Sequence, residues 1–408
     1  MRPTYQARRK WTSRLRVDVA IAALTTGALA AALALAAFLP AGAEAGTSGR
    51  RTGSDAHRHP THHAPRASRR SSAGATLVIE GAGFGHGVGM SQWGALGYAE
   101  HGYSAAEILA HYYTGTAIGH VSPRQIVKVL VGRQVKRVPL EAYVRGVVAA
   151  EMPSSWPAAA LEAQAIASRT YALTADAGGK RFDVYADARS QVYLGRAAQT
   201  PSSNAAVKAT EGEVVTYEGK PVITYFFSSS GGETEDVQNV FEGASPQPWL
   251  VGVPDPYEQS PMRSWTMTMG FSEAARRLKG LLDGAFEGIE VLRRGWSPRI
   301  VSAYVLGSAG NTEVSGAQLA SRLGLYSTWA HFSVMSGGKL REEPDLSGRP
   351  AGARGEDEGT QPAGTQPAGA ESTAPGPGSS GPLVEAPTAD GSEQGRAVDE
   401  PSGGMRAP

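Results

Sequence analysis

An apolar background rich in Ala, Val and Leu extends over residues 140–172 and is interrupted by a Ser-Ser-Trp-Pro turn. This pattern predicts two consecutive helices. Four polar side chains stand in the apolar background: Glu151, two residues before a proline at the end of the first helix, and Gln164, Arg169 and Tyr171 in the second. Because polar groups on a buried surface cost free energy unless they find partners, the pattern predicts a built site.

Strand-like and helix-like patterns follow one another irregularly in the rest of the chain. β-Branched and aromatic residues predict strands at 76–81, 125–138, 214–219, 221–230 and 289–306. Capping boxes at Ser104 and Ser315 predict helices that end near Tyr113 and at Gly324. Two further helices are predicted at 205–210 and 272–282, the second capped by its serine. Since no regular βαβ period appears, the predicted fold class is α+β.

The N-terminal residues have the layout of a secretory signal. Six basic and no acidic residues precede position 17, residues 20–38 are apolar apart from Thr and Gly, and Ala-Gly-Ala at 41–43 offers a cleavage site. The apolar run is about 20 residues long, which also suits an uncleaved membrane anchor through 17–40. Residues 1–45 are therefore predicted to be a signal peptide or a membrane anchor, and both alternatives predict an exported protein.

Two low-complexity stretches flank the predicted domain at 76–335. Residues 46–75 form a basic linker rich in His, Pro and Ser; its four clustered histidines leave a metal tract open, although a solvated linker explains them without a ligand. Residues 339–408 hold twelve acidic and six basic side chains among mostly Pro, Gly, Ser and Ala. Because such a composition cannot bury enough apolar surface to fold, residues 336–408 are predicted to be a disordered acidic tail.

Composition and missing motifs exclude several kinds of chemistry. The 408 residues contain no cysteine, which rules out disulfides, a cysteine nucleophile and a thiolate metal site. The glycine-rich run at 81–89 does not fit G-x-G-x-x-G, and no Walker, H-E-x-x-H or G-x-S-x-G motif occurs. No cofactor and no nucleic-acid partner are predicted, and the formal net charge of +1 points to no particular partner.

The glycine-rich run allows two interpretations. Its five glycines fit a tight turn against a core strand, or a backbone-lined groove in which His86, Ser91 and Gln92 face a ligand. We favour the groove, because glycine permits close approach of the backbone to a ligand.

Glu151 also allows two interpretations. It follows Val-Val-Ala-Ala, and apolar surroundings raise the pKa of a carboxyl toward that of a general acid. The alternative is a surface glutamate at the end of an amphipathic helix, as we expect Glu141 and Glu162 to be.

A serine- and glycine-rich run at 228–232 directly follows an aromatic stretch of predicted strand. The hydroxyls of Ser229 and Ser230 and the backbone around Gly231 are suited to grip a sugar at such a position. Loops of this composition are also common without any ligand.

Several motifs, taken together, resemble the SpoIID/LytB family of bacterial cell-wall proteins, which includes stage II sporulation D proteins and amidase enhancers. The central one is LEAYVRGVVAAEMPSSWPAAALEAQAIASRTYAL, followed in the family's order by SQVYLG, FFSSSGGETED, DPYEQSP and LGLYSTW. The run GFGHGVGMSQWGALGYAEHG resembles a second family signature. The resemblance covers residues 75–334 and implies a single SpoIID-like domain.

This resemblance implies a murein lytic transglycosylase, which cleaves MurNAc–GlcNAc bonds in glycan strands stripped of stem peptides and leaves 1,6-anhydro ends. It places the catalytic acid on Glu151 and an active-site arginine on Arg169, for which a structural ion pair is the alternative. The candidate substrate-binding residues are His86, Ser91, Gln92, Gln164, Tyr171, Ser229, Ser230 and Gly231.

Two departures from the family pattern carry predictions. The GHGVGMSQ signature follows the catalytic glutamate in the sporulation proteins but precedes it here, at 85–92. A shared fold would then be permuted, with His86 and Gln92 beside Glu151. Some relatives carry Cys and His before the Gln-Val-Tyr motif, which could bind zinc; residues 183–190 carry neither, so no structural metal is predicted.

Three functions stay open on the sequence. The favoured one is a peptidoglycan lytic transglycosylase in the cell wall or at the outer face of the cytoplasmic membrane. The second is a non-catalytic glycan-binding enhancer of an N-acetylmuramoyl-L-alanine amidase, and the third is a structural wall adaptor. Peptidoglycan glycan strands are the predicted partner in each, and a cell-wall amidase is an added partner in the second.

Overall fold

The computed structural model describes residues 74–347. The predicted signal or anchor, nearly all of the linker and the tail beyond residue 347 lie outside the described residues. Within residues 74–347, no helix combines the length and apolar character needed to cross a bilayer.

Helices surround the first of two hydrophobic cores. They are α2 (Gln92–Glu100), α3 (Ala105–Tyr112), α4 (Leu140–Glu151), α5 (Ala158–Thr174) and α6 (Pro201–Ala209), with the short η2 (Gly195–Ala198) and α7 (Val237–Val240). α5 contacts α2, α3, α4 and α6, and twelve of its 17 residues are buried. A helix that is apolar on nearly all sides belongs in a core, which explains the continuous Ala-rich pattern of this segment.

Small sheets lie around the same core. β5 (Gln134–Pro139), β4 (Ile126–Val131) and β6 (Val184–Tyr185) form one sheet, and β3 (Ala117–His120), β7 (Glu213–Tyr217) and β8 (Lys220–Pro221) form another. β2 (Met90–Ser91) pairs in parallel with β9 (Phe226–Phe227). This last pairing brings the glycine-rich run against the aromatic strand.

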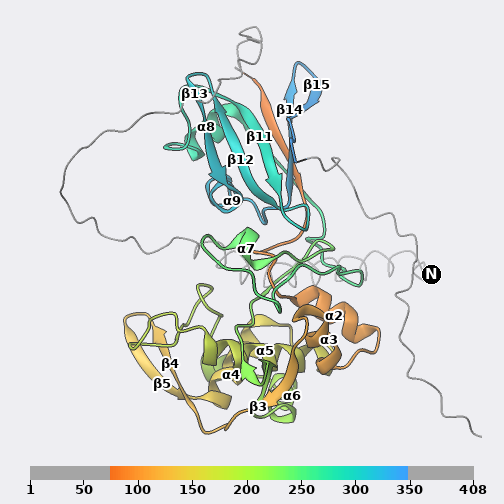
Figure 1. Ribbon diagram of the computed structural model, residues 1–408, viewed down its shortest axis with the longest axis vertical. Coiled ribbons are helices and arrows are strands. Elements are labelled where there is room, and N and C mark those ends of the chain that lie inside the picture. Colours follow the sequence, from red (N-terminus) through yellow and green to blue (C-terminus); the bar gives the residue numbers. More distant parts are fainter. Residues whose placement is uncertain (1–73, 348–408) are drawn as a thin grey trace, which may run out of the picture. The chain divides into compact units, whose positions relative to one another are not determined.

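Two antiparallel sheets and two helices enclose the second core. One sheet has the order β10 (Trp265–Gly270), β1 (Thr76–Gly81), β14 (Ala330–Ser336) and β15 (Lys339–Glu342), and the other has the order β11 (Phe286–Arg294), β12 (Ile300–Gly307) and β13 (Gly310–Ser315). α8 (Phe271–Arg277) contacts β11, and α9 (Gly316–Leu323) contacts β12. Figure 1 shows β1, the first strand, beside β14, which lies about 250 positions later.

The glycine-rich run connects the two cores. β1 belongs to the second core, whereas Val88 and Met90 belong to the first. Between them, Gly83, Gly85, Gly87 and Gly89 all have positive φ, a conformation that favours glycine. The run is thus a tight crossover segment of the backbone.

The structure confirms the α+β class and most of the predicted elements. Both predicted capping boxes are present, at the start of α3 and at the start of α9, and Gly324 ends α9 in a left-handed conformation. α8 differs from the prediction because it is capped by Gly270, not by Ser272. The permuted relation to the family stays a prediction.

Several elements were missed, among them the strands β3, β10, β13 and β14. α2 was not predicted, because its glycines hid the helical pattern; a Cβ at Gly94 or Gly97 would overlap Tyr112 or Tyr257, so glycine is needed for close packing there. The ordered chain also continues beyond the predicted domain end at 335. β15 pairs with β14, and Arg294 forms an ion pair with Asp345 (2.8 Å). A charged edge strand of this kind resembles a tail in composition.

Candidate active site

Glu151 is the last residue of α4 and is only partly buried. Its Oε1 accepts a hydrogen bond from the backbone N–H of Val192 (2.7 Å), and its Oε2 accepts one from the amide of Gln92 (3.1 Å). Burial raises the pKa of the Glu151 carboxyl, and these two bonds offset part of that rise. No cation is bonded to this carboxylate among the hydrogen bonds and ion pairs of the described residues. The arrangement is that of a carboxyl that keeps its proton to a higher pH than an ordinary glutamate does.

A chain of side-chain amides supports the carboxylate. Gln92, the first residue of α2, donates to Glu151 and, through the same nitrogen, to Oε1 of Gln164 on α5 (3.4 Å). Gln164 in turn donates to the hydroxyl of Ser168 (2.8 Å). Three helices therefore meet at the acid, and the predicted proximity of Gln92 to Glu151 is confirmed.

Ser91 shapes this arrangement without facing a cavity. Its side chain is fully buried, and its hydroxyl caps α2 by accepting from the N–H of Gly94 (3.0 Å). The cap sets the start of α2 and so the position of Gln92, which follows it.

Two tryptophans that were not among the predicted site residues lie close to Gln92 and Glu151 in the chain. Trp93 follows Gln92, and Trp156 lies in the turn after α4. The centroids of their rings are 5.2 Å apart, the ring planes are inclined at 64°, and both residues are partly exposed. The sequence could have pointed to them, because both are tryptophans close to motif residues and exposed aromatic rings commonly provide a binding surface.

A cavity of about 170 Å³ shares the segment 190–192 with the residues that hold the acid. The cavity is lined by His86, Tyr171, Ala188, Arg189, Ser190, Tyr225, Phe226 and Phe241. Ser190 lines it, and Val192, two residues later, holds Glu151. Burial raises the pKa of Tyr171 to about 12, and the charge of Glu151 contributes to the rise.

His86 contributes its ring to this cavity, while its nitrogens bond the backbone. Nε2 donates to the carbonyl of Phe226 (3.1 Å), and Nδ1 accepts from the N–H of Val88 (3.0 Å). Burial, with a smaller contribution from the charge of Arg299, lowers the pKa of His86 to about 4. The ring is therefore neutral at pH 7 and presents an apolar surface. No contact between His86 and Glu151 is seen among the described side chains.

Arg169 does not bond the candidate acid. Its guanidinium is fully buried and forms a two-pronged ion pair with Glu141 (2.8 and 2.7 Å), at the opposite end of α4, and it also donates to the carbonyl of Glu213 (3.0 Å). These contacts favour the alternative of a structural ion pair. The expectation that Glu141 is a surface residue is wrong, because only 8% of it is exposed.

The two serines predicted to bind a sugar instead donate hydrogen bonds to buried carboxylates. Ser229 donates to Oε1 of Glu258 (2.7 Å), and Ser230 donates to Oδ2 of Asp255 (2.7 Å). Both serines are fully buried. Gly231, with φ at +80°, packs so closely that a Cβ would touch Ala82. This cluster stabilises the crossover segment, so a direct grip on a sugar has no support in these contacts.

The glycine run, in turn, packs against its own chain. A Cβ at Gly89 would overlap the carbonyl oxygen of Tyr225, and one at Gly87 would overlap the guanidinium of Arg299. The close backbone approach that glycine permits is used inside the protein. The glycines themselves therefore form a tight turn against a core strand, while the ring of His86 lines the cavity described above.

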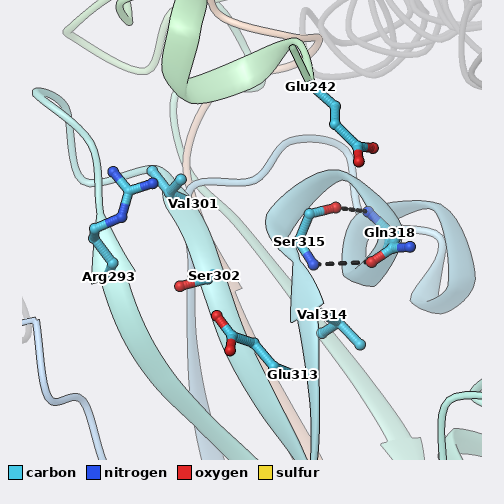
Figure 2. Close-up of a pocket in the computed structure, with 8 residues that line it drawn as sticks. All are labelled: Glu242, Arg293, Val301, Ser302, Glu313, Val314, Ser315 and Gln318. Carbon is cyan, nitrogen blue, oxygen red and sulfur yellow. Dashed lines mark hydrogen bonds between the residues drawn. The ribbon is translucent and has the colours of Figure 1, made fainter. Parts of the chain in front are cut away.

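A second cavity, of about 470 Å³, lies over β12, β13 and α9 (Figure 2). Its lining is polar and includes Arg293, Glu242 and Glu313, and the capping box of Ser315 and Gln318 lies at its wall. None of the candidate site residues lines it. No group of three His, Cys, Asp or Glu side chains suited to a metal occurs among residues 74–347, and the absence of a metal stays a prediction.

Comparisons with known proteins show which proteins these residues are similar to. The family model described as stage II sporulation protein matches residues 132–217, which include Glu151 and Arg169. An uncharacterized protein of Brachyspira hyodysenteriae is 39% identical over 142 residues, which are 34% of this chain and 38% of that protein. Stage II sporulation protein D of Bacillus subtilis is 30% identical over 213 residues, 48% of this chain and 60% of that protein. The amidase enhancer of the same species is 34% identical over 126 residues, 31% of this chain and 17% of that protein.

Residues 132–217 thus match the SpoIID family model, and the chain is similar to relatives named stage II sporulation protein D and amidase enhancer, the two groups of proteins that its motifs indicated. It spans at most 60% of the length of these three relatives. What the whole protein does is therefore a matter for proposal.

Proposed function

We propose that this chain is an exported peptidoglycan lytic transglycosylase with Glu151 as its acid. The observation that carries the proposal is the environment of Glu151. Its carboxyl has a raised pKa and partial exposure, and it accepts hydrogen bonds only from neutral amides among the described residues. A carboxyl of this kind holds a proton at a pH where an ordinary glutamate has lost it.

The reaction needs one carboxyl group. Glu151 donates its proton to the glycosidic oxygen as the bond from that oxygen to C1 of the MurNAc residue breaks and positive charge develops on the sugar. The C6 hydroxyl oxygen of the same sugar then bonds to C1, and its proton passes to the ionised Glu151. The product carries a 1,6-anhydro ring, and the acid returns to its starting state. Because the nucleophile belongs to the substrate, its high effective molarity replaces a water and a second carboxylate.

The surrounding residues have supporting roles in this proposal. Gln92 orients the carboxylate through its amide, and Gln164 orients Gln92. Trp93 and Trp156 provide an aromatic surface on which a sugar ring can lie. Arg169 acts indirectly: it holds Glu141 in the first turn of α4, the helix that ends at Glu151.

A second candidate function comes from the relatives. One of them is named amidase enhancer, which favours a role in presenting glycan to a cell-wall amidase without chemistry of its own. A place in the cell envelope is common to both functions, as the sporulation and amidase-enhancer relatives suggest.

Mass spectrometry of products from denuded glycan strands separates the two functions. The full chain and its Glu151→Gln variant are incubated side by side, with Glu162→Gln, a partly exposed glutamate on α5, as the matched control. We expect anhydro-ended fragments from the wild type and from Glu162→Gln, and a rate at least about 10²-fold lower from Glu151→Gln. Intact strands with all three proteins, together with retained glycan binding, would contradict the transglycosylase and favour the enhancer.

A further inference from the structure

The aromatic cavity that Tyr171 and Ser190 line has a volume suited to one substituent. At about 170 Å³ it is smaller than the roughly 300–1,000 Å³ of pockets that enclose a drug-sized ligand. Four of its lining residues are the aromatic residues Tyr171, Tyr225, Phe226 and Phe241, and His86 adds a neutral ring. A small group with an apolar part fits such a wall.

Arg189 is the cation among the residues that line this cavity. Its guanidinium lies 3.9 Å above the ring of Tyr185, and its Nε and Nη2 donate to the two oxygens of Asp187 (2.8 and 2.7 Å). These bonds occupy one edge of the guanidinium, which has five N–H donors in all. The side chain is 45% exposed, so its remaining donors are within reach of an anion from solvent.

The cavity and the acid belong to one continuous segment. Arg189 and Ser190 line the cavity, and the N–H of Val192 holds Oε1 of Glu151. Arg189 thus lies three residues before the residue that holds the acid, and we take a substrate whose scissile oxygen lies at Glu151 to direct a neighbouring substituent toward Arg189. This step rests on the proposed function, which sets a MurNAc–GlcNAc bond at Glu151.

A muramyl residue carries the matching substituent. Its lactyl ether has a methyl group and a carboxyl group. The carboxyl is tied up in an amide when a stem peptide is attached, and it is a free carboxylate when the peptide has been removed. A methyl group suits the aromatic wall, and a carboxylate suits the guanidinium. The neighbouring N-acetyl group would also fit the wall, but it offers no charge to the arginine.

We propose that this cavity receives the lactyl group of the muramyl residue and that Arg189 binds its free carboxylate. Arg189 is thus the residue that would provide the preference for glycan strands without stem peptides, which the resemblance implies. An attached peptide removes the negative charge and adds bulk at the cavity, so both effects act against intact wall.

Calorimetric binding tests this selectivity without cleavage. The full chain carrying Glu151→Gln is titrated with a GlcNAc–MurNAc tetrasaccharide whose lactyl carboxyls are free, and with the same tetrasaccharide after their conversion to methylamides. We expect the free acid to bind roughly three- to tenfold more tightly, as for a partly exposed charge pair, and we expect the ratio to fall in high salt.

Three further variants, each combined with Glu151→Gln, test whether Arg189 causes the preference for the free carboxylate. Arg189→Gln should bring the ratio close to one while leaving the affinity for the methylamide unchanged, and Arg189→Lys should keep part of the preference. Arg181→Gln, an exposed arginine on the preceding turn that does not line the cavity, should keep the whole preference.

Equal binding of the two tetrasaccharides, absence of binding to both, or a preference that survives Arg189→Gln would overturn the inference. These outcomes differ from failure of the proposed function. If the Glu151→Gln chain shows the expected binding preference but the wild type forms no anhydro ends, the carboxylate site stands and the transglycosylase proposal fails.

Discussion

The two ends of helix α4 each carry a glutamate in a polar site, and the two sites are built in opposite ways. Glu141, in the first turn, is 8% exposed and pairs with the buried guanidinium of Arg169 through two hydrogen bonds. Glu151, at the last residue, is less buried yet bonds only an N–H group and an amide among the described side chains. One carboxylate is neutralised by a cation, and the other is not.

This difference separates structure from chemistry on a single helix. A buried pair that satisfies all its donors fixes geometry, because removing either partner leaves an uncompensated charge. A carboxyl without a cation, held by neutral donors, keeps a raised pKa and can exchange a proton. The helix is anchored at one end and presents its candidate acid at the other.

The largest effect is expected from breaking the anchored end. Arg169→Met leaves Glu141 buried without its cation, and we expect the free energy of unfolding to fall by about 3–5 kcal/mol. Denaturant unfolding followed by circular dichroism measures this. Arg276→Met, at an arginine that is 71% exposed and paired with Glu273, serves as the control and should cost less than about 1 kcal/mol.

A double variant distinguishes a structural from a catalytic Arg169. Arg169→Met combined with Glu141→Leu replaces the pair by apolar groups, and we expect most of the lost stability to return. Glycan cleavage should return with it. A stable double variant without cleavage would contradict the structural role and restore Arg169 as a catalytic residue.

A smaller effect, of opposite sign, is expected at the other end. Because the pKa of Glu151 is raised in the folded protein, ionisation favours the unfolded state, and wild-type stability falls as the pH rises through the folded pKa. Glu151→Gln removes this loss. The variant should therefore be more stable than the wild type at pH 7, and the difference should vanish below about pH 4, near the pKa of an unfolded glutamate.

Thermal unfolding across this pH range checks the sign. Glu107 provides the comparison, because hydrogen bonds from Ser104 lower its pKa and so make its ionised form stabilising. Glu107→Gln should lose stability relative to the wild type as the pH rises. Parallel pH curves for the wild type and Glu151→Gln would contradict a raised pKa.

The smallest effect is expected from Gln92→Leu, which removes one donor to the Glu151 carboxylate. The hydrogen bond from Gln92 favours the ionised form, so its loss should raise the pKa of Glu151 further. A general acid acts in its protonated form, and the decline in cleavage rate on the alkaline side should move to higher pH. The pH–rate profile measures the shift, with Gln164→Leu, which does not bond Glu151, expected to move it less. A shift toward lower pH would contradict the assignment of Gln92.

Local features of the fold were predictable because their causes are local. The capping boxes at Ser104 and Ser315 each depend on residues three positions apart, and both form as predicted. The Ala-rich run predicted α4 and α5, because a helix buried on nearly all sides has no polar face. α2 was missed because its glycines are there for contacts with distant residues.

The candidate site was predictable in part. The motif around Glu151 selected the acid, and the order of the signatures led to the expected contact with Gln92. The cavity was not foreseen as a unit, although Arg189 and Ser190 stand directly before the Gln-Val-Tyr motif that was recognised. His86 and Tyr171 were selected and do line it, but the sequence did not show that the nitrogens of His86 bond the backbone.

The sequence by itself determined the fold class and the helix pair, because periodicity and capping act over a few residues, and the family resemblance of its motifs selected the candidate acid. The tertiary structure alone decided which polar groups meet. Glu151 bonds an amide 59 positions earlier, Glu141 pairs with an arginine 28 positions later, and Ser229 bonds a carboxylate 29 positions later. A buried polar group takes whichever partner the packing brings within about 3 Å, and that choice depends on how whole helices and strands meet. The same glutamate side chain therefore becomes an anchor at one end of α4 and a candidate acid at the other.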